Sequence, residues 1–226
     1  MMRKLMRAIG MAEYGWDELL IMIVASALGI ILLRIFLPPS LWLLTWLPLF
    51  PLAIVVWFFR DPERSGPTEK NTLLSPADGT VADIVEVDVP EFISGKALRI
   101  GIFLSPLNVH VNRAPNDGVV RFVQFKSGEF LPAYDPKAPE RNESASLGLV
   151  APDGRKIMVK QITGLLARRI VCEAKDGDAL ARGQRYGMIK FGSRTELYVP
   201  LSDKPVSAVK IGDVVKGGES VLCRIM

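Results

Sequence analysis

The chain has 226 residues, of which 49% are hydrophobic and 23% charged, and its formal net charge is +4. This length suits one or two domains. The basic residues are scattered among acidic ones rather than gathered in a run, which argues against a nucleic-acid-binding protein. The two cysteines, Cys172 and Cys223, are too few for a disulfide framework, so buried reduced thiols are expected.

Two apolar runs stand near the N-terminus. Residues 19–37 are apolar except for Ser26 and Arg34, and residues 41–59 carry no charge. About 20 apolar residues in a helix cross the roughly 30 Å hydrocarbon core of a bilayer. Pro38-Pro39 separates the runs, so residues 1–60 are predicted to form a membrane-anchoring helical hairpin. Two shallow interfacial helices are the alternative, and two further prolines should kink the second helix.

The flanks of the hairpin predict its orientation. They contain Arg3, Lys4 and Arg7 before the first run and Arg60, Arg64 and Lys70 after the second, whereas the turn has no basic residue. Positively charged flanks stay in the cytoplasm. Residues 61–226 are therefore predicted to lie on the cytoplasmic face of the cell (inner) membrane. A secretory signal peptide fits poorly, because the second run follows at once.

Downstream the pattern is that of short β-strands. Segments rich in Val, Ile, Phe and Tyr alternate with Gly, Pro, Asp and Asn; they cover residues 79–87, 98–104, 119–125, 156–162 and 195–200. We expect a mostly-β, sandwich- or barrel-like domain with one short helix near 164–170. Residues 176–183 and 211–218 share a Gly-Asp turn pattern, which resembles turns of biotinyl and lipoyl carrier domains. It indicates a style of folding rather than a function.

One Gly-Ser pair, Gly192-Ser193, falls between two strand-like segments. A serine hydroxyl that attacks the preceding carbonyl needs an unusual backbone geometry, which glycine permits. The ester formed in this way can eliminate to dehydroalanine, which hydrolyses to a pyruvoyl group and ammonia. The pair alone would usually mark a loop, so its context has to support this interpretation.

That context resembles the short, membrane-anchored form of the phosphatidylserine decarboxylase family. The resemblance rests on motifs that occur in the family's order, at residues 58–64, 75–79, 103–113, 141–143 and 164–172 through 191–194. It implies self-cleavage into residues 1–192 (the β chain) and 193–226 (the α chain), with Ser193 converted to a covalent pyruvoyl cofactor. That group would form a Schiff base with the serine amine of phosphatidylserine and act as electron sink, giving phosphatidylethanolamine and CO2.

The resemblance also implies roles for further residues. Asp78 and His110 match motif positions assigned to self-processing or catalysis, and His110 is the only histidine. A structural turn is the alternative for Asp78. Longer family members have a second histidine where this chain has Arg113, so His110 could serve cleavage, decarboxylation or both. Arg141, Asn142 and Glu143 are candidate substrate-binding residues, although a solvated loop would explain them almost as well.

Three other functions compete with this one. A membrane-anchored lipoyl- or biotinyl-like binding or carrier module without catalysis is one alternative: a carrier would need an exposed lysine at a hairpin tip, and no lysine has that setting, while a binding module gives no reason for the Gly-Ser context. A zinc peptidase would need several ligands, so with one histidine no metal is expected. A decarboxylase of an ether-linked serine phospholipid cannot be told apart by sequence. The expected partners are the phospholipid, the membrane and the other cleaved chain, and a homo-oligomer stays open.

Overall fold

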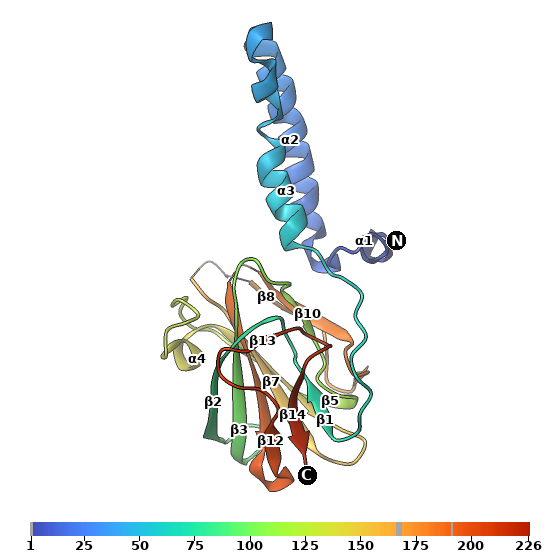
Figure 1. Cartoon of the computed structure of the whole chain (residues 1–226), viewed down its shortest axis with the longest axis vertical. Coiled ribbons are helices and arrows are strands. Elements are labelled where there is room, and N and C mark those ends of the chain that lie inside the picture. The colour runs from blue at the N-terminus through green and yellow to red at the C-terminus, as the bar shows by residue number, and fades with distance from the viewer. Residues whose placement is uncertain (1, 166–168, 191) are drawn as a thin grey trace. The chain divides into compact units, whose positions relative to one another are not determined.

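The computed structural model describes residues 2–165, 169–190 and 192–226. It separates into two compact units, Met1–Glu63 and Arg64–Met226. The first unit begins with α1 (Met2–Ala8) and the short 3-10 helix η1 (Glu13–Gly15). Its remaining helices are α2 (Trp16–Phe36), the 3-10 helix η2 (Pro39–Trp46) and α3 (Leu49–Phe58), and α3 returns alongside α2 (Figure 1). We call α2, η2 and α3 the apolar helix pair.

Prolines set the boundaries of these helices. Leu37 leaves α2 in an extended conformation ahead of Pro38-Pro39. The second apolar run is not one α-helix, because it is 3-10 helical up to Trp46 and α-helical only from Leu49. Proline lacks a backbone N–H, and Pro51 is tolerated because it falls in the first turn of α3, where that donor would have no partner in the helix. The sequence predicted a kink, and the structure has a change of helix type.

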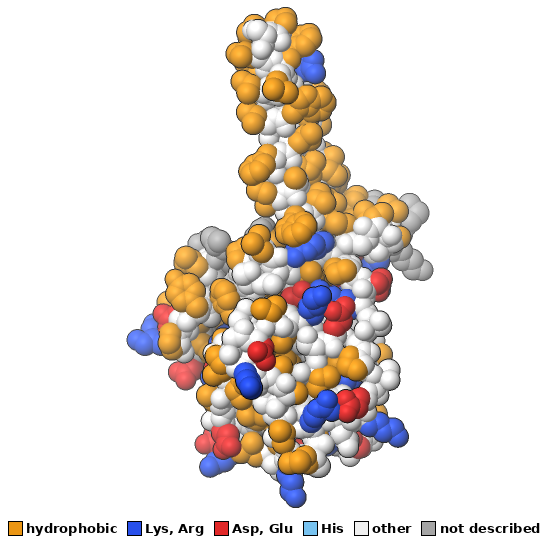
Figure 2. Space-filling model, viewed as in Figure 1, with side chains coloured by type: hydrophobic (Ala, Val, Ile, Leu, Met, Phe, Trp, Pro, Cys, Tyr) orange, Lys and Arg blue, Asp and Glu red, His pale blue; other side chains and the backbone are white. Residues whose placement is uncertain are grey.

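Close packing joins the two halves of the pair. A Cβ on Gly29 would lie 2.9 Å from Pro48 Cγ, so glycine lets the helices approach. The Ser26 hydroxyl donates to the Pro48 carbonyl at 2.8 Å. Most other side chains here are apolar and exposed (Figure 2). Two segments, Glu13–Phe36 and Pro39–Phe58, have the length and hydropathy to cross a membrane.

The second unit is mostly β, as predicted. Its strands are β1 (Thr72–Leu74), β2 (Gly79–Val89), β3 (Gly95–Leu104), β4 (Val111–Arg113), β5 (Gly118–Lys126), β6 (Ser144–Val150), β7 (Lys156–Ile162), β8 (Arg169–Cys172), β9 (Ala179–Leu180), β10 (Arg185–Lys190), β11 (Ser193–Pro200), β12 (Pro205–Ser207), β13 (Val214–Val215) and β14 (Val221–Ile225). Two short helices, α4 (Ala138–Arg141) and η3 (Leu201–Asp203), interrupt them. Where a helix was expected near 164–170, Arg169 and Ile170 belong to β8, and 166–168 lie outside the described residues.

The strands form one large sheet and two small ones. The large sheet has eight strands in the order β13-β2-β3-β11-β7-β6-β5-β9, and the small ones are β1-β14-β12 and β4-β10-β8. Neighbouring strands are antiparallel throughout these pairings. Strand β11 occupies an inner position of the large sheet between β3 and β7, and it begins at Ser193.

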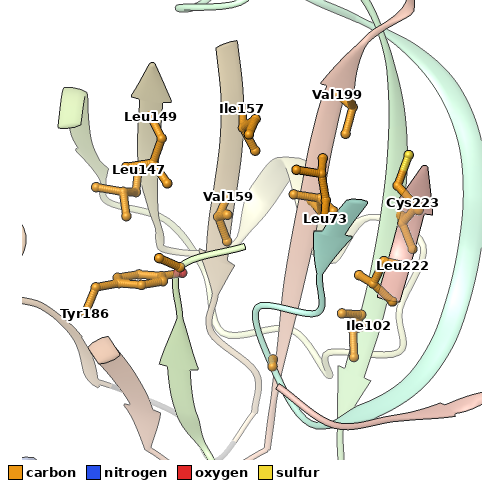
Figure 3. Close-up of a cluster of buried hydrophobic side chains, with 14 of the residues drawn as sticks. Leu73, Ile102, Leu147, Leu149, Ile157, Val159, Tyr186, Val199, Leu222 and Cys223 are labelled. Carbon is orange, nitrogen blue, oxygen red and sulfur yellow. The ribbon is translucent and has the colours of Figure 1, made fainter. Parts of the chain in front are cut away.

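The main core lies between the large sheet and the small sheets. Figure 3 shows Ile102, Val159 and Val199 of the large sheet facing Leu73 and Leu222 from β1 and β14. Alternate residues of a strand point to opposite faces, so each strand supplies one apolar row to this core. Cys223 is buried, as expected for a reduced thiol, and Cys172 is partly buried. Neither forms a disulfide.

The Gly-Asp pattern is a structural repeat. In the turns 175–178 and 210–213 a glycine has positive φ, +90° at Gly177 and +94° at Gly212. In both turns the aspartate carboxylate accepts the backbone N–H three residues earlier at 2.8 Å. Each turn leads into a two-residue strand, β9 or β13, and these strands form the opposite edges of the large sheet. The same kind of turn therefore precedes the strand at each edge of the large sheet.

Candidate active site

Gly192-Ser193 lies where the chain crosses from one sheet to another. Strand β10 of a small sheet ends at Lys190, and Ser193 opens β11 of the large sheet, opposite Leu104 of β3. Gly192 has φ +63°, in the left-handed region that favours glycine. Ser193 is fully buried, and its Oγ has no hydrogen-bond partner among the described residues. Burying a hydroxyl without a hydrogen-bond partner costs free energy, and a catalytic role is one reason for such an unsatisfied group.

His110 contacts Gly192 directly. Its Nε2 lies 3.3 Å from the Gly192 backbone nitrogen, and its Nδ1 lies 2.9 Å from the Asn108 carbonyl oxygen. Since a carbonyl oxygen only accepts, Nδ1 carries the proton and Nε2 presents its lone pair to the Gly192 N–H. The imidazole is completely buried. The structure thus brings together the histidine and the Gly-Ser pair predicted from sequence.

A tight turn puts His110 in this position. The turn follows the end of β3, and the Asn108 side-chain oxygen accepts hydrogen bonds from both the backbone N–H and the hydroxyl of Ser105 at 2.8 Å. Such side-chain bonds to nearby backbone stabilise turns. Leu104 stands just before the turn and pairs with Ser193 of β11. Because the turn reverses the chain after Leu104, it returns His110 to the neighbourhood of Gly192.

Gly164 is a site residue that the sequence did not single out for a role. A Cβ at Gly164 would overlap the Gly192 carbonyl oxygen and would lie 3.1 Å from the Ala133 Cβ. Only glycine leaves room for that carbonyl, which belongs to the peptide bond between Gly192 and Ser193. The sequence signals of Gly164 were a place at the start of the family motif 164–172 and a glycine shortly after a strand, neither of which indicates contact with Gly192.

A buried amide network lies next to the start of β11, and sequence reasoning missed it. The Asn112 amide donates to Thr195 Oγ1 at 3.1 Å and accepts from Gln161 Nε2 at 2.8 Å. Gln161 and Thr195 are register partners in β7 and β11. Gln161 is 1% exposed, and its Oε1 has no partner among the described residues. The network fixes β11 two residues after Ser193.

The other face of β11 carries an ionic cluster in which Arg194 and Glu196 are buried and Asp83 and Arg99 partly buried. Arg194 donates to Glu196 at 2.8 Å and pairs with Asp83, while Arg99 also pairs with Asp83 at 3.2 Å. Tyr198 donates its hydroxyl to Glu196, and burial together with this carboxylate raises the pKa of Tyr198. The tyrosine therefore stays a donor at neutral pH. The cluster holds the residue after Ser193 in place from the face opposite the amide network.

The contacts of Asp78 are an ion pair and a backbone hydrogen bond. Its carboxylate forms a two-pronged ion pair with Arg64, with Nη2 to Oδ2 at 2.8 Å, and accepts the Gly217 backbone N–H at 2.8 Å. Arg64 is 6% exposed. These bonds stabilise the first residues of the second unit and a turn. The contacts described for Asp78 do not include His110 or Ser193.

The three residues predicted to bind substrate brace the loops near Gly164. The Asn142 amide is buried and bonds to both backbone groups of Leu131 and, at 2.8 Å, to the Thr163 carbonyl. Arg141 forms an exposed ion pair with Glu129. Glu143 contributes its backbone carbonyl, which accepts from Thr163. No cluster of three potential metal ligands occurs among residues 2–165, 169–190 and 192–226.

The site thus defines an antiparallel β-protein in which a single buried histidine contacts the glycine of a Gly-Ser pair whose serine is buried. The family model of phosphatidylserine decarboxylase matches residues 52–223. The phosphatidylserine decarboxylase proenzyme of Salinibacter ruber is 45% identical over 82% of this chain and 86% of the relative. The proenzymes of Symbiobacterium thermophilum and Desulfotalea psychrophila are 47% and 43% identical over 76% and 81% of this chain, and 79% and 85% of theirs. The chain belongs to the phosphatidylserine decarboxylase family.

Proposed function

We propose that this protein is a proenzyme that cuts itself between Gly192 and Ser193, converts Ser193 to a pyruvoyl group, and decarboxylates phosphatidylserine to phosphatidylethanolamine and CO2. Family membership supports the reaction. The observation that carries the self-cleavage is the placement of His110 Nε2 at 3.3 Å from the nitrogen of Gly192, whose neighbour in the chain, Ser193, has a buried hydroxyl without a described partner.

Self-cleavage uses groups that the chain holds in place. His110 takes the Ser193 hydroxyl proton as Oγ attacks the Gly192 carbonyl, and the proton passes to the Ser193 nitrogen as the peptide bond breaks. Elimination then releases the Gly192 carboxylate from the ester and leaves dehydroalanine, and water converts this to the pyruvoyl end and ammonia. The left-handed backbone of Gly192 and the absence of a side chain at Gly164 support this attack, because they allow the carbonyl a position that a Cβ at residue 164 would obstruct.

After cleavage the same residues would surround the new end of the α chain. A pyruvoyl group supplies the electron sink for loss of the substrate carboxyl. Our proposed role for His110 in this stage is to deliver a proton to the substrate α-carbon in place of CO2. The amide network and the ionic cluster hold β11 from its two faces, so they keep the end of that strand fixed during turnover.

The apolar helix pair is proposed to cross the cell (inner) membrane with both ends in the cytoplasm. Its length and hydropathy support this, as do the basic flanks. A two-chain lipid stays in the bilayer because each buried methylene contributes about 0.8 kcal/mol. The enzyme must therefore take the headgroup at the membrane surface.

Intact-mass spectrometry of the freshly purified protein tests the proposal. We expect two chains, residues 1–192 and the 34 residues 193–226, the smaller one lighter by one ammonia than a chain with an N-terminal serine. The Ser193→Ala variant should stay whole. The cut protein should release CO2 from phosphatidylserine labelled in its carboxyl group. A correctly folded wild-type chain that remains uncut would overturn the proposal.

A further inference from the structure

Three loops meet around Gly192. Pro106 lies 4.0 Å from the position of a Gly192 Cβ, Gly164 faces the Gly192 carbonyl oxygen, and Ala133 packs against Gly164. Each of these residues is small or rigid, and each comes from a different connection of the second unit, after β3, β5 or β7. The loops thus enclose the cleavage peptide with their inner residues.

The next residue of each loop is large, apolar and exposed. Leu107 follows Pro106 and is 72% exposed, Tyr134 follows Ala133 and is 77% exposed, and Leu165 follows Gly164 and is 57% exposed. We call Leu107, Tyr134 and Leu165 the apolar rim. Single exposed apolar residues are ordinary, but here the same arrangement recurs on three loops around one cleavage peptide.

The rim also borders a cavity beside the site. Tyr134 lines a space of about 370 Å³ together with Phe103 and Arg194, the residue that follows Ser193. The Tyr134 ring meets Phe103 edge-on, with ring centres 6.5 Å apart. Tyrosine combines an apolar ring with a polar hydroxyl, and it is enriched where protein meets the headgroup layer of a membrane.

We propose that the apolar rim is the surface with which the β unit contacts the bilayer while it takes up its substrate. The inference rests on the proposed function, since a lipid that stays in the membrane has to reach Ser193, which is fully buried. A protein partner fits the rim poorly, because a stable protein interface buries about 1,200 Å² or more and three side chains supply far less. A lipid surface needs only a few inserted apolar side chains.

The covalent connection between the units supports a membrane as the occupant. Asp61 is held in the first unit by its N–H, which donates to the Gly10 carbonyl at 2.7 Å. Arg64 is held in the second unit by Asp78. Only Pro62 and Glu63 lie between, and three residue steps span at most about 11 Å. A chain whose first unit is inserted in a bilayer therefore keeps its β unit close to lipid.

Activity on two forms of the substrate tests the rim. The double variant Leu107→Ser, Leu165→Ser of the full chain is compared with Ile211→Ser, Val214→Ser, which changes residues of similar exposure in another turn and at the start of β13. We expect both to cut themselves completely and to decarboxylate a short-chain, monomeric phosphatidylserine at the wild-type rate. The rim variant alone should lose about tenfold or more on phosphatidylserine in vesicles. Equal losses on both substrates, or equal losses in both variants, would overturn the inference.

A second measurement does not depend on catalysis. Leu107→Cys and Ile211→Cys chains carrying Ser193→Ala are labelled with an environment-sensitive fluorophore and reconstituted in vesicles that contain a nitroxide lipid. We expect quenching of the label at position 107 and little at position 211. Equal quenching at the two positions, or none at 107, refutes the rim. If the wild type decarboxylates neither substrate while label 107 is quenched, the proposed function fails and the membrane contact stands.

Discussion

Asp78 and Asp117 occupy equivalent positions in the two halves of the β unit. Each precedes the glycine that begins a long strand, β2 or β5. Each also accepts a backbone N–H from the turn that follows a two-residue edge strand: Gly217 donates to Asp78 at 2.8 Å, and Arg182 donates to Asp117 at 2.9 Å. The backbone bond is therefore shared by the two aspartates as part of the fold's internal repeat. Asp78 forms, in addition, the ion pair with Arg64.

That comparison predicts a structural role for Asp78. Removing one partner of a buried ion pair costs about 3–5 kcal/mol, so Asp78→Asn and Arg64→Ala should each lower the melting temperature of the second unit. Both variants should cut themselves at close to the wild-type rate at temperatures where they remain folded. The measurement combines thermal unfolding with timed intact-mass analysis, and Asp117→Asn serves as the control for the shared backbone bond.

The Arg64 variant separates structure from chemistry. If Asp78 took part directly in cleavage, Asp78→Asn would stay uncut while folded, and Arg64→Ala, which leaves the carboxylate in place, would still cut. That pattern would contradict the structural role.

Replacement of His110 should affect cleavage most. His110→Ala removes the group that contacts Gly192, and a missing general base lowers a rate by about 10²–10⁴-fold. We expect the cleavage half-time, followed by intact mass after a short pulse of cell-free synthesis, to lengthen by that order. Any chain that does cut should still lack decarboxylation, since the proposal gives His110 both roles. Wild-type cleavage by the alanine variant would mean that another base serves this step.

The two thiols should be slow to react while the protein is folded. Burial raises the pKa of Cys172 and of Cys223 to about 11, and the thiolate is the reactive form. A pKa raised in the folded state contributes stability that is fully present below the unfolded value of 9.0 and is lost as pH rises through about 11. Alkylation near neutral pH should be about a hundredfold slower in the folded protein than in urea. Equal rates in both would show that the thiols are accessible.

The parts of this fold that could be predicted from the sequence are those that depend on local patterns. Alternating apolar residues predicted the β domain, and the Gly-Asp pattern predicted the two turns because each is closed by residues only three positions apart. The meeting of His110 and Gly192, 82 positions apart, came from the family resemblance and from no spacing rule. The amide network depends on the register that pairs Gln161 with Thr195, and a sequence does not reveal register. Asn142 was a candidate substrate-binding residue, and the hydrogen bonds of its buried amide to backbone groups could not be predicted from sequence.

Gly164 offers the most specific test of the carbonyl geometry. In Gly164→Ala the new methyl group and the Gly192 carbonyl oxygen cannot both keep their positions, and a shift of about 1 Å in a reacting group can cost about 10²-fold in rate. We expect slower self-cleavage by that order, with a fold that still unfolds cooperatively. Gly95→Ala is the matched control, because a Cβ there meets nothing within 4 Å. If Gly164→Ala cut as fast as Gly95→Ala, the carbonyl would not need its observed position, and the attack would have to proceed from a different arrangement of the peptide.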